Sequence, residues 1–360
     1  MQGRKSPSGK DLKKVGPAKR SLECTGCSQV AIGVNRKVGD MTAVARDARH
    51  LQLGSSDAAA SVAVIIVTFN SADALPALLD SLVDGLDGLE QFEIIVVDND
   101  SKDGSAEIAE AHRLQPTVIR TGRNAGYAAA INIGSSRASI GSHLLILNPD
   151  LRLYPGAVKP LIEHVATSSV GVVVPINYRE DGTIDPTLRR EPSIVTAWAD
   201  AVLGGRLAAR LGVGEIVGAL HHYDQRRPVQ WATGSALLVS ASARKTVGAW
   251  DESFFLYSEE VDYQRRIREA GFEVVYEPRS KVMHASGGSG TGPRLFALLT
   301  ANRIRYYGRY HGALQTAIFK LGVIIGHAAR SWRSASHRAA LMSAVTPRRS
   351  VAAFVKSTRG

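Results

Sequence analysis

The chain has 360 residues, 44% of them hydrophobic, and carries a formal net charge of +11 at pH 7. This length and composition fit a folded domain with a sizeable core and exclude a wholly disordered polypeptide. The charge is unevenly spread: residues 1–60 hold 11 Lys and Arg against 5 Asp and Glu, residues 291–360 hold 12 against none, and residues 61–290 hold 21 against 28. An acidic middle argues against the basic folded core of a nucleic-acid-binding protein.

Residues 1–60 are rich in Lys, Ser, Gly and Ala and have no sustained helical or strand period, which predicts a disordered basic leader. Its two cysteines, Cys24 and Cys27, have no second pair to complete a zinc site, so we expect free thiols in a reducing compartment. No apolar segment follows the early lysines, so we do not expect a secretory signal peptide.

From residue 61 the pattern alternates between β-branched apolar runs and helical repeats. This alternation predicts an α/β fold with a wound, mainly parallel sheet and helices on both faces. We expect strands at 62–67, 93–97, 117–120 and 143–147, separated by a helix at 74–83, a helix through Ile108 and a helix that ends at Arg137. After about residue 170 the pattern is less regular, with short strands at 171–174, 229–233 and 273–276 and a helix at 259–270.

Polar side chains follow each of the first four predicted strands, where ligands bind in wound sheets. They are Asn70, Asp98, Asn124 and the Asn148–Asp150 turn. No Gly-x-Gly-x-x-Gly follows the first strand and no P-loop motif is present, so a bound diphosphate would need another counter-ion. Asp150 is placed to offer a carboxylate to Mg²⁺ or Mn²⁺, although on spacing alone an Asn-Pro-Asp turn is also just a turn.

Two further features are candidates for chemistry. Glu259, Glu260 and Asp262 begin a predicted helix directly after an aromatic loop, and shelter by aromatic rings can raise the pKa of a carboxyl group. The alternative is that these acids only match the helix dipole. His284 precedes a Gly-rich loop and is either a ligand or an ordinary surface histidine.

In chain order, these residues resemble a known family. Its motifs appear here as Val67–Asn70, Val96–Ser101 with Asp103–Ser105, Asn124–Tyr127 with Asn132, Leu147–Asp150, Trp231–Gly234, Glu259–Asp262 with Arg265, and His284. The order closely resembles the family 2 glycosyltransferases, in particular their rhamnosyltransferase-like branch, over residues 62–290. The resemblance implies the GT-A fold for residues 61–290.

The resemblance also implies roles for single residues. Donor contacts fall on Thr68, Asn70, Asp98, Asn124, Gly126, Asn132 and Asp150, and acceptor contacts on Trp231, Gly234 and Asp262. Asp150 and His284 would hold the metal, Mg²⁺ or Mn²⁺. Glu260 stands where the family's catalytic base is usually Asp, with Glu259 as the fallback, and Asn148 replaces the first acid of the metal motif.

The activity implied is inverting transfer of a sugar from a nucleotide donor to a polyprenyl-linked or polysaccharide acceptor in cell-envelope glycan synthesis. The donor expected first is dTDP-L-rhamnose, and a galactofuranose or hexose donor such as a UDP-sugar is the alternative. A competing interpretation is a non-catalytic protein that binds membrane or nucleic acid through its basic ends.

Residues 291–360 contain an apolar segment, 314–329, flanked by arginines and aromatic residues with no acid nearby. This composition predicts a membrane-associating helical tail that lies at the inner face of the plasma membrane. The protein would then be cytoplasmic and peripheral. The alternative is that the helix packs on the catalytic domain or mediates dimerisation.

Overall fold

The structure is a computed structural model that describes residues 61–167, 169–285 and 292–358. The predicted leader, with Cys24 and Cys27, and the Gly-rich loop after His284 lie outside the described residues.

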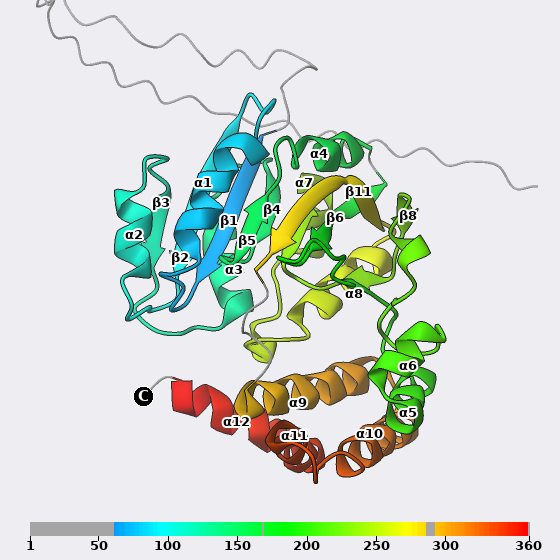
Figure 1. Ribbon diagram of the computed structural model, residues 1–360. Helices are drawn as coiled ribbons and strands as arrows, with labels where there is room; N and C mark the ends of the chain where they lie inside the picture. The colour runs from blue at the N-terminus through cyan, green and yellow to red at the C-terminus, as the bar shows by residue number, and fades with distance from the viewer. Residues whose placement is uncertain (1–60, 168, 286–291, 359–360) are drawn as a thin grey trace, which may run out of the picture. The chain divides into compact units, whose positions relative to one another are not determined.

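A twisted nine-stranded sheet forms the centre of the described chain (Figure 1). Its main path has the order β3-β2-β1-β4-β10-β6-β11-β5, and β8 pairs with β11. Neighbours β3, β2, β1 and β4 are parallel, whereas β10 runs antiparallel to both β4 and β6. The strands are β1 (Val62–Thr68), β2 (Phe92–Asp98), β3 (Thr117–Arg120), β4 (His143–Leu147), β5 (Leu151–Leu153), β6 (Val170–Tyr178), β8 (Arg227–Pro228), β10 (Ala236–Val239) and β11 (Glu273–His284). A second, two-stranded sheet pairs β7 (Leu188–Arg189) with β9 (Trp231–Ala232).

The helices alternate with these strands up to residue 269 and then continue without strands after residue 292. The first group is α1 (Leu75–Gly85), α2 (Ser105–Ala111), α3 (Tyr127–Arg137), α4 (Lys159–Val165), α5 (Ile194–Leu203), α6 (Gly205–Arg210), α7 (Ala241–Val247) and α8 (Glu259–Glu269), with short 3₁₀ turns η1 (Leu220–His222) and η2 (Glu252–Phe254). The last four are α9 (Pro293–Tyr310), α10 (Ala313–Ala328), α11 (Ala335–Val345) and α12 (Pro347–Thr358).

Both faces of the sheet are buried, because alternate side chains of each strand enter different cores. In β1, Val62, Val64 and Ile66 pack with α1, α2 and α4, whereas Ala63, Ile65 and Val67 pack with α3, α7 and α8. The unbroken apolar run of this strand is therefore required by its position between two layers of helices.

The predicted α/β fold is confirmed, and the four parallel strands and the helices between them fall where the sequence placed them. The second half of the sheet has longer strands, and more of them, than the sequence predicted. β6 and β11 run well past the expected 171–174 and 273–276, and β5 and β10 were not expected. The extension of β11 matters for function, because it carries the strand to His284.

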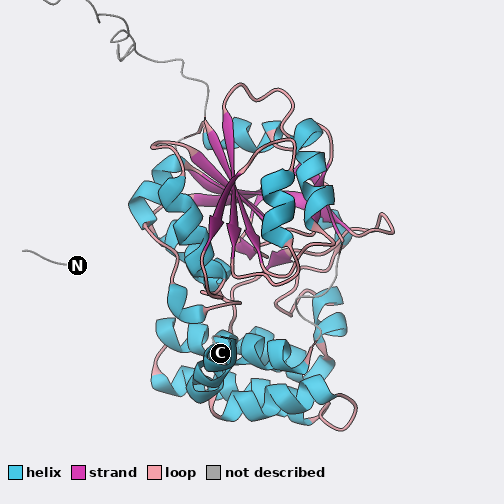
Figure 2. Cartoon of the chain, turned by 90° about the vertical axis from the view of Figure 1, so that its left-hand side faces the viewer, coloured by secondary structure: helices cyan, strands magenta, loops and turns pink. Residues whose placement is uncertain are grey.

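The helices after residue 292 pack against each other and against α5 (Figure 1). Figure 2 shows a group of helices that lies apart from the strands of the central sheet. α9 contacts α10, α11 and α12, while α10 contacts α5, which comes from the middle of the chain. None of the helices in the described ranges is long and apolar enough to cross a membrane.

Candidate active site

The carboxyl ends of β1 and β2 place two buried polar side chains side by side. Thr68 and Asp98 are register partners at the ends of the two strands. Asp98 Oδ2 accepts a hydrogen bond from the Ser101 amide at 3.1 Å. Within the described residues, however, Thr68 Oγ1 and Asp98 Oδ1 are buried and have no hydrogen-bond partner. An unpaired buried polar atom costs about 1–3 kcal/mol, so this pair is suited to a ligand that supplies the missing partners.

The loops that follow these strands are tied together by Asn70. Its backbone is left-handed, with φ 52°, and its amide N–H donates to Ser101 Oγ at 2.9 Å. Its side-chain Oδ1 accepts from the Lys102 amide at 2.8 Å. Asn70 thus sets the position of the loop that follows Asp98, while its own side chain stays exposed.

Asn124 and Gly126 build the turn that starts α3. Asn124 Oδ1 accepts from the Gly126 amide and from Asn99 Nδ2, both at 3.1 Å. Gly126 has φ 95°, and a Cβ there would lie 2.6 Å from the carbonyl oxygen of Phe255. Only glycine lets these two backbones approach so closely, and the adjacent Tyr127 amide donates to the same carbonyl at 2.6 Å.

The end of β11 brings His284 to Asp150. His284 pairs with Leu151 across the β11–β5 ladder, and its Nε2 lies 3.1 Å from Asp150 Oδ1. Burial lowers the pKa of His284, but the hydrogen bond and charge of Asp150 more than offset this, so the pKa is raised. The two residues predicted to hold a metal are 134 positions apart in sequence and adjacent in space.

These two side chains are of the kinds that hold a hard divalent cation together with substrate phosphates. No group of three or more His, Cys, Asp or Glu side chains gathers at a metal-binding distance within the described ranges. A cation held by Asp150 and His284 would also bind phosphate oxygens of the substrate and water. Asn148, at the position of the missing acid, instead accepts a hydrogen bond from the Tyr127 hydroxyl at 2.8 Å.

Glu259 and Glu260 start α8 in a buried setting. Each has one carboxylate oxygen, Oε2, that is buried without a partner among the described residues. Burial raises the pKa of Glu259, and repulsion from Glu260 raises it further. Burial also raises the pKa of Glu260. Carboxyl groups with raised pKa values are suited to take up a proton.

The segment before these acids, residues 251–258, has an uncommon backbone, and we refer to it as the 251–258 loop. Three of its residues that are not glycine adopt left-handed conformations, with φ between 67° and 74°: Phe255, Tyr257 and Ser258. Such conformations cost of order 1–3 kcal/mol each and gather at functional sites. Asn302 of α9 contributes to holding them, because its Nδ2 donates to the carbonyls of Phe254 at 2.7 Å and Leu256 at 2.9 Å.

The residues predicted to bind the acceptor make different contacts. Trp231 is buried, and its indole N–H donates to the Arg190 carbonyl at 2.9 Å. Gly234 lies against Glu260, since a Cβ there would be 3.3 Å from Glu260 Cβ. Asp262 takes part in an ion-pair network.

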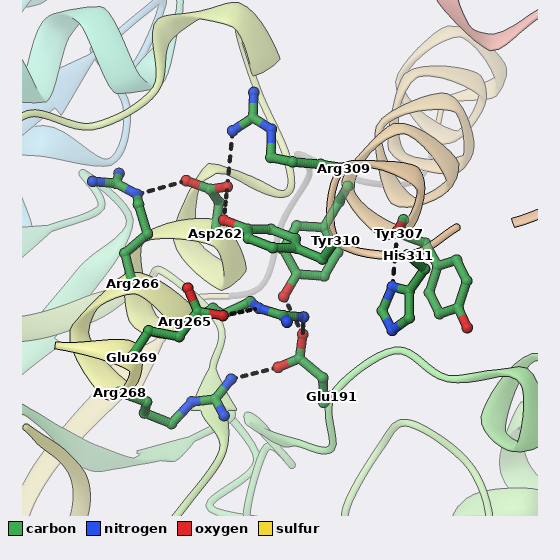
Figure 3. A network of polar contacts seen from close by, with 11 residues as sticks. Glu191, Asp262, Arg265, Arg266, Arg268, Glu269, Tyr307, Arg309, Tyr310 and His311 are labelled. Carbon is green, nitrogen blue, oxygen red and sulfur yellow. Dashed lines mark hydrogen bonds and ion pairs between the residues drawn. The ribbon is translucent and has the colours of Figure 1, made fainter. Parts of the chain in front are cut away.

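That network joins α8 to α9 (Figure 3). The fully buried Asp262 receives Arg266 and Arg309, each at 2.9 Å, and the Tyr310 hydroxyl at 2.7 Å. Glu191 pairs with Arg265 and Arg268 and also accepts from Tyr306. The bonds that fix Asp262 and Glu191 give both acids a part in holding the C-terminal helices to the catalytic region.

Asn132, predicted to contact the donor, has its amide engaged elsewhere. Its Nδ2 donates to the Trp250 carbonyl at 3.0 Å and to Glu252 at 2.9 Å, and its Oδ1 accepts from the Trp250 amide at 2.9 Å. These bonds fix the start of the 251–258 loop.

Two residues near Glu260 had no predicted role. Burial raises the pKa of Tyr127, and the charges of Glu259, Glu260 and Asp150 raise it further. Its hydroxyl lies 3.3 Å from the carbonyl oxygen of Gly234, the residue that lies against Glu260. Tyr127 belongs to the Asn124–Tyr127 motif, but its sequence position alone predicted no role for its hydroxyl. Only the polar groups around it in the structure single it out. Arg189 has a pKa lowered by burial, and its charge in turn favours ionised Glu260. No pattern marked Arg189, because β7 has two residues.

Two hollows border this region. A small one of about 40 Å³ is lined by Glu260, Trp231, Glu215, Arg303 and Tyr306 among others. A much larger open groove of about 810 Å³ lies between η2, α9 and α12, where Arg305, Arg348 and Lys356 line it beside Val351 and Val355.

Comparison with known proteins identifies the family. The sequence profile described as "Glycosyl transferase family 2" matches residues 63–223. The "N-acetylglucosaminyl-diphospho-decaprenol L-rhamnosyltransferase" of Mycobacterium tuberculosis is 30% identical over 232 residues, which are 61% of this chain and 75% of that protein. This chain belongs to glycosyltransferase family 2.

Another relative and a solved structure match as follows. The "Undecaprenyl-phosphate 4-deoxy-4-formamido-L-arabinose transferase" of Yersinia pestis is 30% identical over 193 residues, 51% of this chain and 57% of its own. Among solved structures, residues 1–349 of S. aureus TarS are 14% identical, with a TM-score of 0.49 and coverage of 83% of each chain. As a glycosyltransferase of this family with a wound, mainly parallel sheet, the chain has the GT-A fold that its motifs implied.

The family match ends at residue 223, which divides the site. Thr68, Asn70, Asp98, Asn124 and Asp150 lie within the matched residues, whereas Glu259, Glu260 and His284 lie beyond them. For two members of the second group the structure shows the neighbours: His284 lies beside Asp150, and Glu260 lies against Gly234.

Proposed function

We propose that this glycosyltransferase moves L-rhamnose from dTDP-L-rhamnose to a polyprenyl-diphosphate-linked glycan in cell-envelope synthesis. The observation that carries the proposal is the 30% identity to the mycobacterial L-rhamnosyltransferase over 232 residues. Galactofuranose and hexose donors are the alternatives.

The donor base would bind at the ends of β1 and β2. The free oxygen Asp98 Oδ1 is a buried acceptor and suits the imide N–H of a pyrimidine such as thymine or uracil. Thr68 Oγ1, next to it, can donate to a base carbonyl. Asn70 and Asn124 would act through the loops that they hold, and Gly126 through the close approach of the 251–258 loop.

The donor diphosphate would lie beside Asp150 and His284, with Mg²⁺ or Mn²⁺ held by these two side chains. A divalent cation supplies Lewis acidity, which neutralises charge that builds up on the departing nucleoside diphosphate. The support is the pairing of a carboxylate and an imidazole, Asp150 and His284, where β11 pairs with β5.

Glu260 would be the general base. The half-buried Glu260 borders the small hollow, whereas Glu259 is almost wholly buried. As the acceptor hydroxyl attacks the anomeric carbon, Glu260 would take its proton, and the bond to the nucleoside diphosphate would break on the opposite face. This single displacement inverts the anomeric centre.

The test is a panel of nucleotide sugars supplied to the purified full chain with a synthetic polyprenyl-diphosphate-GlcNAc acceptor. We expect transfer from dTDP-L-rhamnose, at a rate at least tenfold above that from UDP-galactofuranose or UDP-hexoses. NMR of the product reports whether the anomeric configuration is inverted. Transfer from a UDP-sugar alone would overturn the donor assignment, and no transfer from any donor would overturn the proposed activity.

A further inference from the structure

The large apolar side chains that remain exposed are concentrated on the helices after the central sheet and on α5 and α6. On α10 they recur at spacings of four, three and four residues, which places them on one face of the helix. They are Leu314, Ile318, Leu321 and Ile325, with exposed fractions between 37% and 74%. The opposite face of α10 buries Phe319 and Val323.

α5 extends this apolar face. Val195 and Val202 are exposed by 67% and 73%, and they lie on the face of α5 that also carries Trp198. Trp198 crosses to α10, where its indole N–H donates to the Ile318 carbonyl at 3.1 Å and its ring lies against Gly322. The two exposed stripes therefore lie side by side, although they come from segments more than 100 residues apart.

The two helices are locked together. A Cβ at Gly326 would lie 3.1 Å from Ala201 Cα, so glycine permits the close packing. At the end of α10, the Arg330 guanidinium donates to the carbonyls of Asp200 and Ala201 at 3.1 and 3.2 Å. The exposed residues of α5 and α10 therefore belong to one packed surface.

The charged side chains of this region are almost all basic. Asp200 is the only acidic residue in α5, α6 and α10, and it is paired with Arg303. Exposed arginines stand beside exposed apolar residues: Arg206 and Arg210 beside Leu207 and Leu211, and Arg333 beside Trp332. Apolar side chains with cations around them match an anionic lipid surface.

We propose that this face of α5 and α10, the α5–α10 face, is the surface through which the protein binds an anionic lipid bilayer. Monomeric proteins rarely leave a contiguous apolar patch of this kind uncovered. A second copy of the chain fits it less well, because pairing the face with itself would bring arginines together without acids to meet them. The inference rests on the proposed function, since a polyprenyl-linked acceptor is confined to the bilayer.

The experiment measures binding of the full chain to vesicles of equal parts phosphatidylglycerol and phosphatidylcholine, and to phosphatidylcholine alone. The variants are Leu314→Glu with Leu321→Glu on α10, and Val202→Glu on α5. The matched control is Ile140→Glu, because Ile140 is 105% exposed in the turn before β4. All four sites are exposed, so folding should be retained, and circular dichroism and thermal unfolding check this.

We expect the wild type and the Ile140→Glu control to bind the anionic vesicles, with weaker binding to neutral vesicles and at high salt. The α10 double variant should bind about 10- to 100-fold more weakly, and Val202→Glu should show a smaller loss. Equal binding by the α10 variant and the control would overturn the inference. So would a concentration-dependent dimer that the same substitutions dissociate, since the face would then be covered by a second copy.

Sugar transfer is measured separately on a short-chain, water-soluble acceptor. Vesicle binding without transfer from any nucleotide sugar would refute the proposed function and leave the α5–α10 face intact. Transfer to the soluble acceptor by a protein that ignores anionic vesicles would refute the face alone.

Discussion

The substitution Asn302→Ala tests whether α9 holds the 251–258 loop in the conformation that presents Glu259 and Glu260. Asn302 is fully buried in α9, and its two donated hydrogen bonds end on carbonyls of that loop. Its Oδ1 also accepts from Arg305 at 2.6 Å. Alanine removes all three bonds and adds no new contact.

The magnitude follows from the groups left without partners. The Leu256 carbonyl loses the Asn302 donor, whereas the Phe254 carbonyl keeps the Leu256 amide at 2.9 Å. A buried group left unpaired costs about 1–3 kcal/mol, so we expect the free energy of unfolding to fall by about 1–3 kcal/mol. For a domain of this size that corresponds to a fall of roughly 2–8 °C in Tm.

The loss of activity should exceed the loss of folded protein. Without Asn302, the three left-handed residues have fewer contacts that offset their strain, so the loop should relax and displace the acids. We expect kcat to fall at least tenfold at a temperature where the variant is folded, with KM for the donor little changed, because Thr68 and Asp98 lie on the sheet.

Two comparisons separate hydrogen bonding from packing. Asn302→Asp keeps the volume and the acceptor for Arg305 but removes the amide donors, so it should be at least as impaired as Asn302→Ala. Gln225→Ala removes an exposed amide that makes no hydrogen bond among the described residues, and it should be neutral. Hydrogen exchange at residues 253–260 should increase in the two Asn302 variants only. If Asn302→Ala has the Tm and the kcat of the wild type, the conformation of the loop does not depend on α9.

Further predictions concern the acids. Glu260→Gln should lower kcat about 100-fold or more with donor binding retained, and near-normal turnover in Glu260→Gln with an inactive Glu259→Gln would move the base by one residue. Because burial raises the pKa of the base and the ionised form is the active one, kcat should rise with pH through a value above the usual carboxyl pKa of about 4.3; a rate independent of pH from 4 to 8 would contradict this. Asp150→Ala should abolish transfer and bound metal without unfolding the protein, whereas full activity in EDTA would exclude the cation. The bonds from Arg279 and His164 overcome burial and lower the pKa of Glu277 to about 2, so its contribution to stability is present above about pH 4.3 and is lost as the pH falls toward 2. Glu277→Gln should reduce the dependence of urea unfolding on pH in that window.

The first half of the fold could be predicted because its signals are local. The run Val62–Val67 is apolar on both faces of the strand. Such a run is typical of a strand that is buried between two layers of helices. Thr68, Asp98 and Asp150 follow directly from the strand ends, since parallel strands bring their carboxyl ends to one edge. Sequence order and spatial order coincide there.

The second half depends on contacts that no short pattern records. β10 has four residues and joins the sheet antiparallel between β4 and β6, so neither its length nor its neighbours marked it. The engagement of Asn132 by Trp250 and of Asp262 by Arg309 links positions 47 to 118 residues apart. Their family motifs located these residues, but the partners that occupy their side chains come from tertiary packing.

The C-terminal helices combine two roles that the sequence presented as one. An acid-free, arginine-rich segment with an apolar run predicted a membrane-associating tail, and that remains a prediction. In the structure, however, α9 buries Asn302 and Tyr306 against the catalytic region, and α10 is locked to α5 through Trp198. Deleting residues 291–360 would therefore remove the support of the 251–258 loop together with half of the α5–α10 face. Loss of vesicle binding and loss of turnover would then appear together whatever their cause. Substitutions at exposed positions such as Leu321 leave the hydrogen bonds of Asn302 in place, and substitution of buried Asn302 leaves the exposed side chains of the α5–α10 face in place, so the two roles can be measured separately.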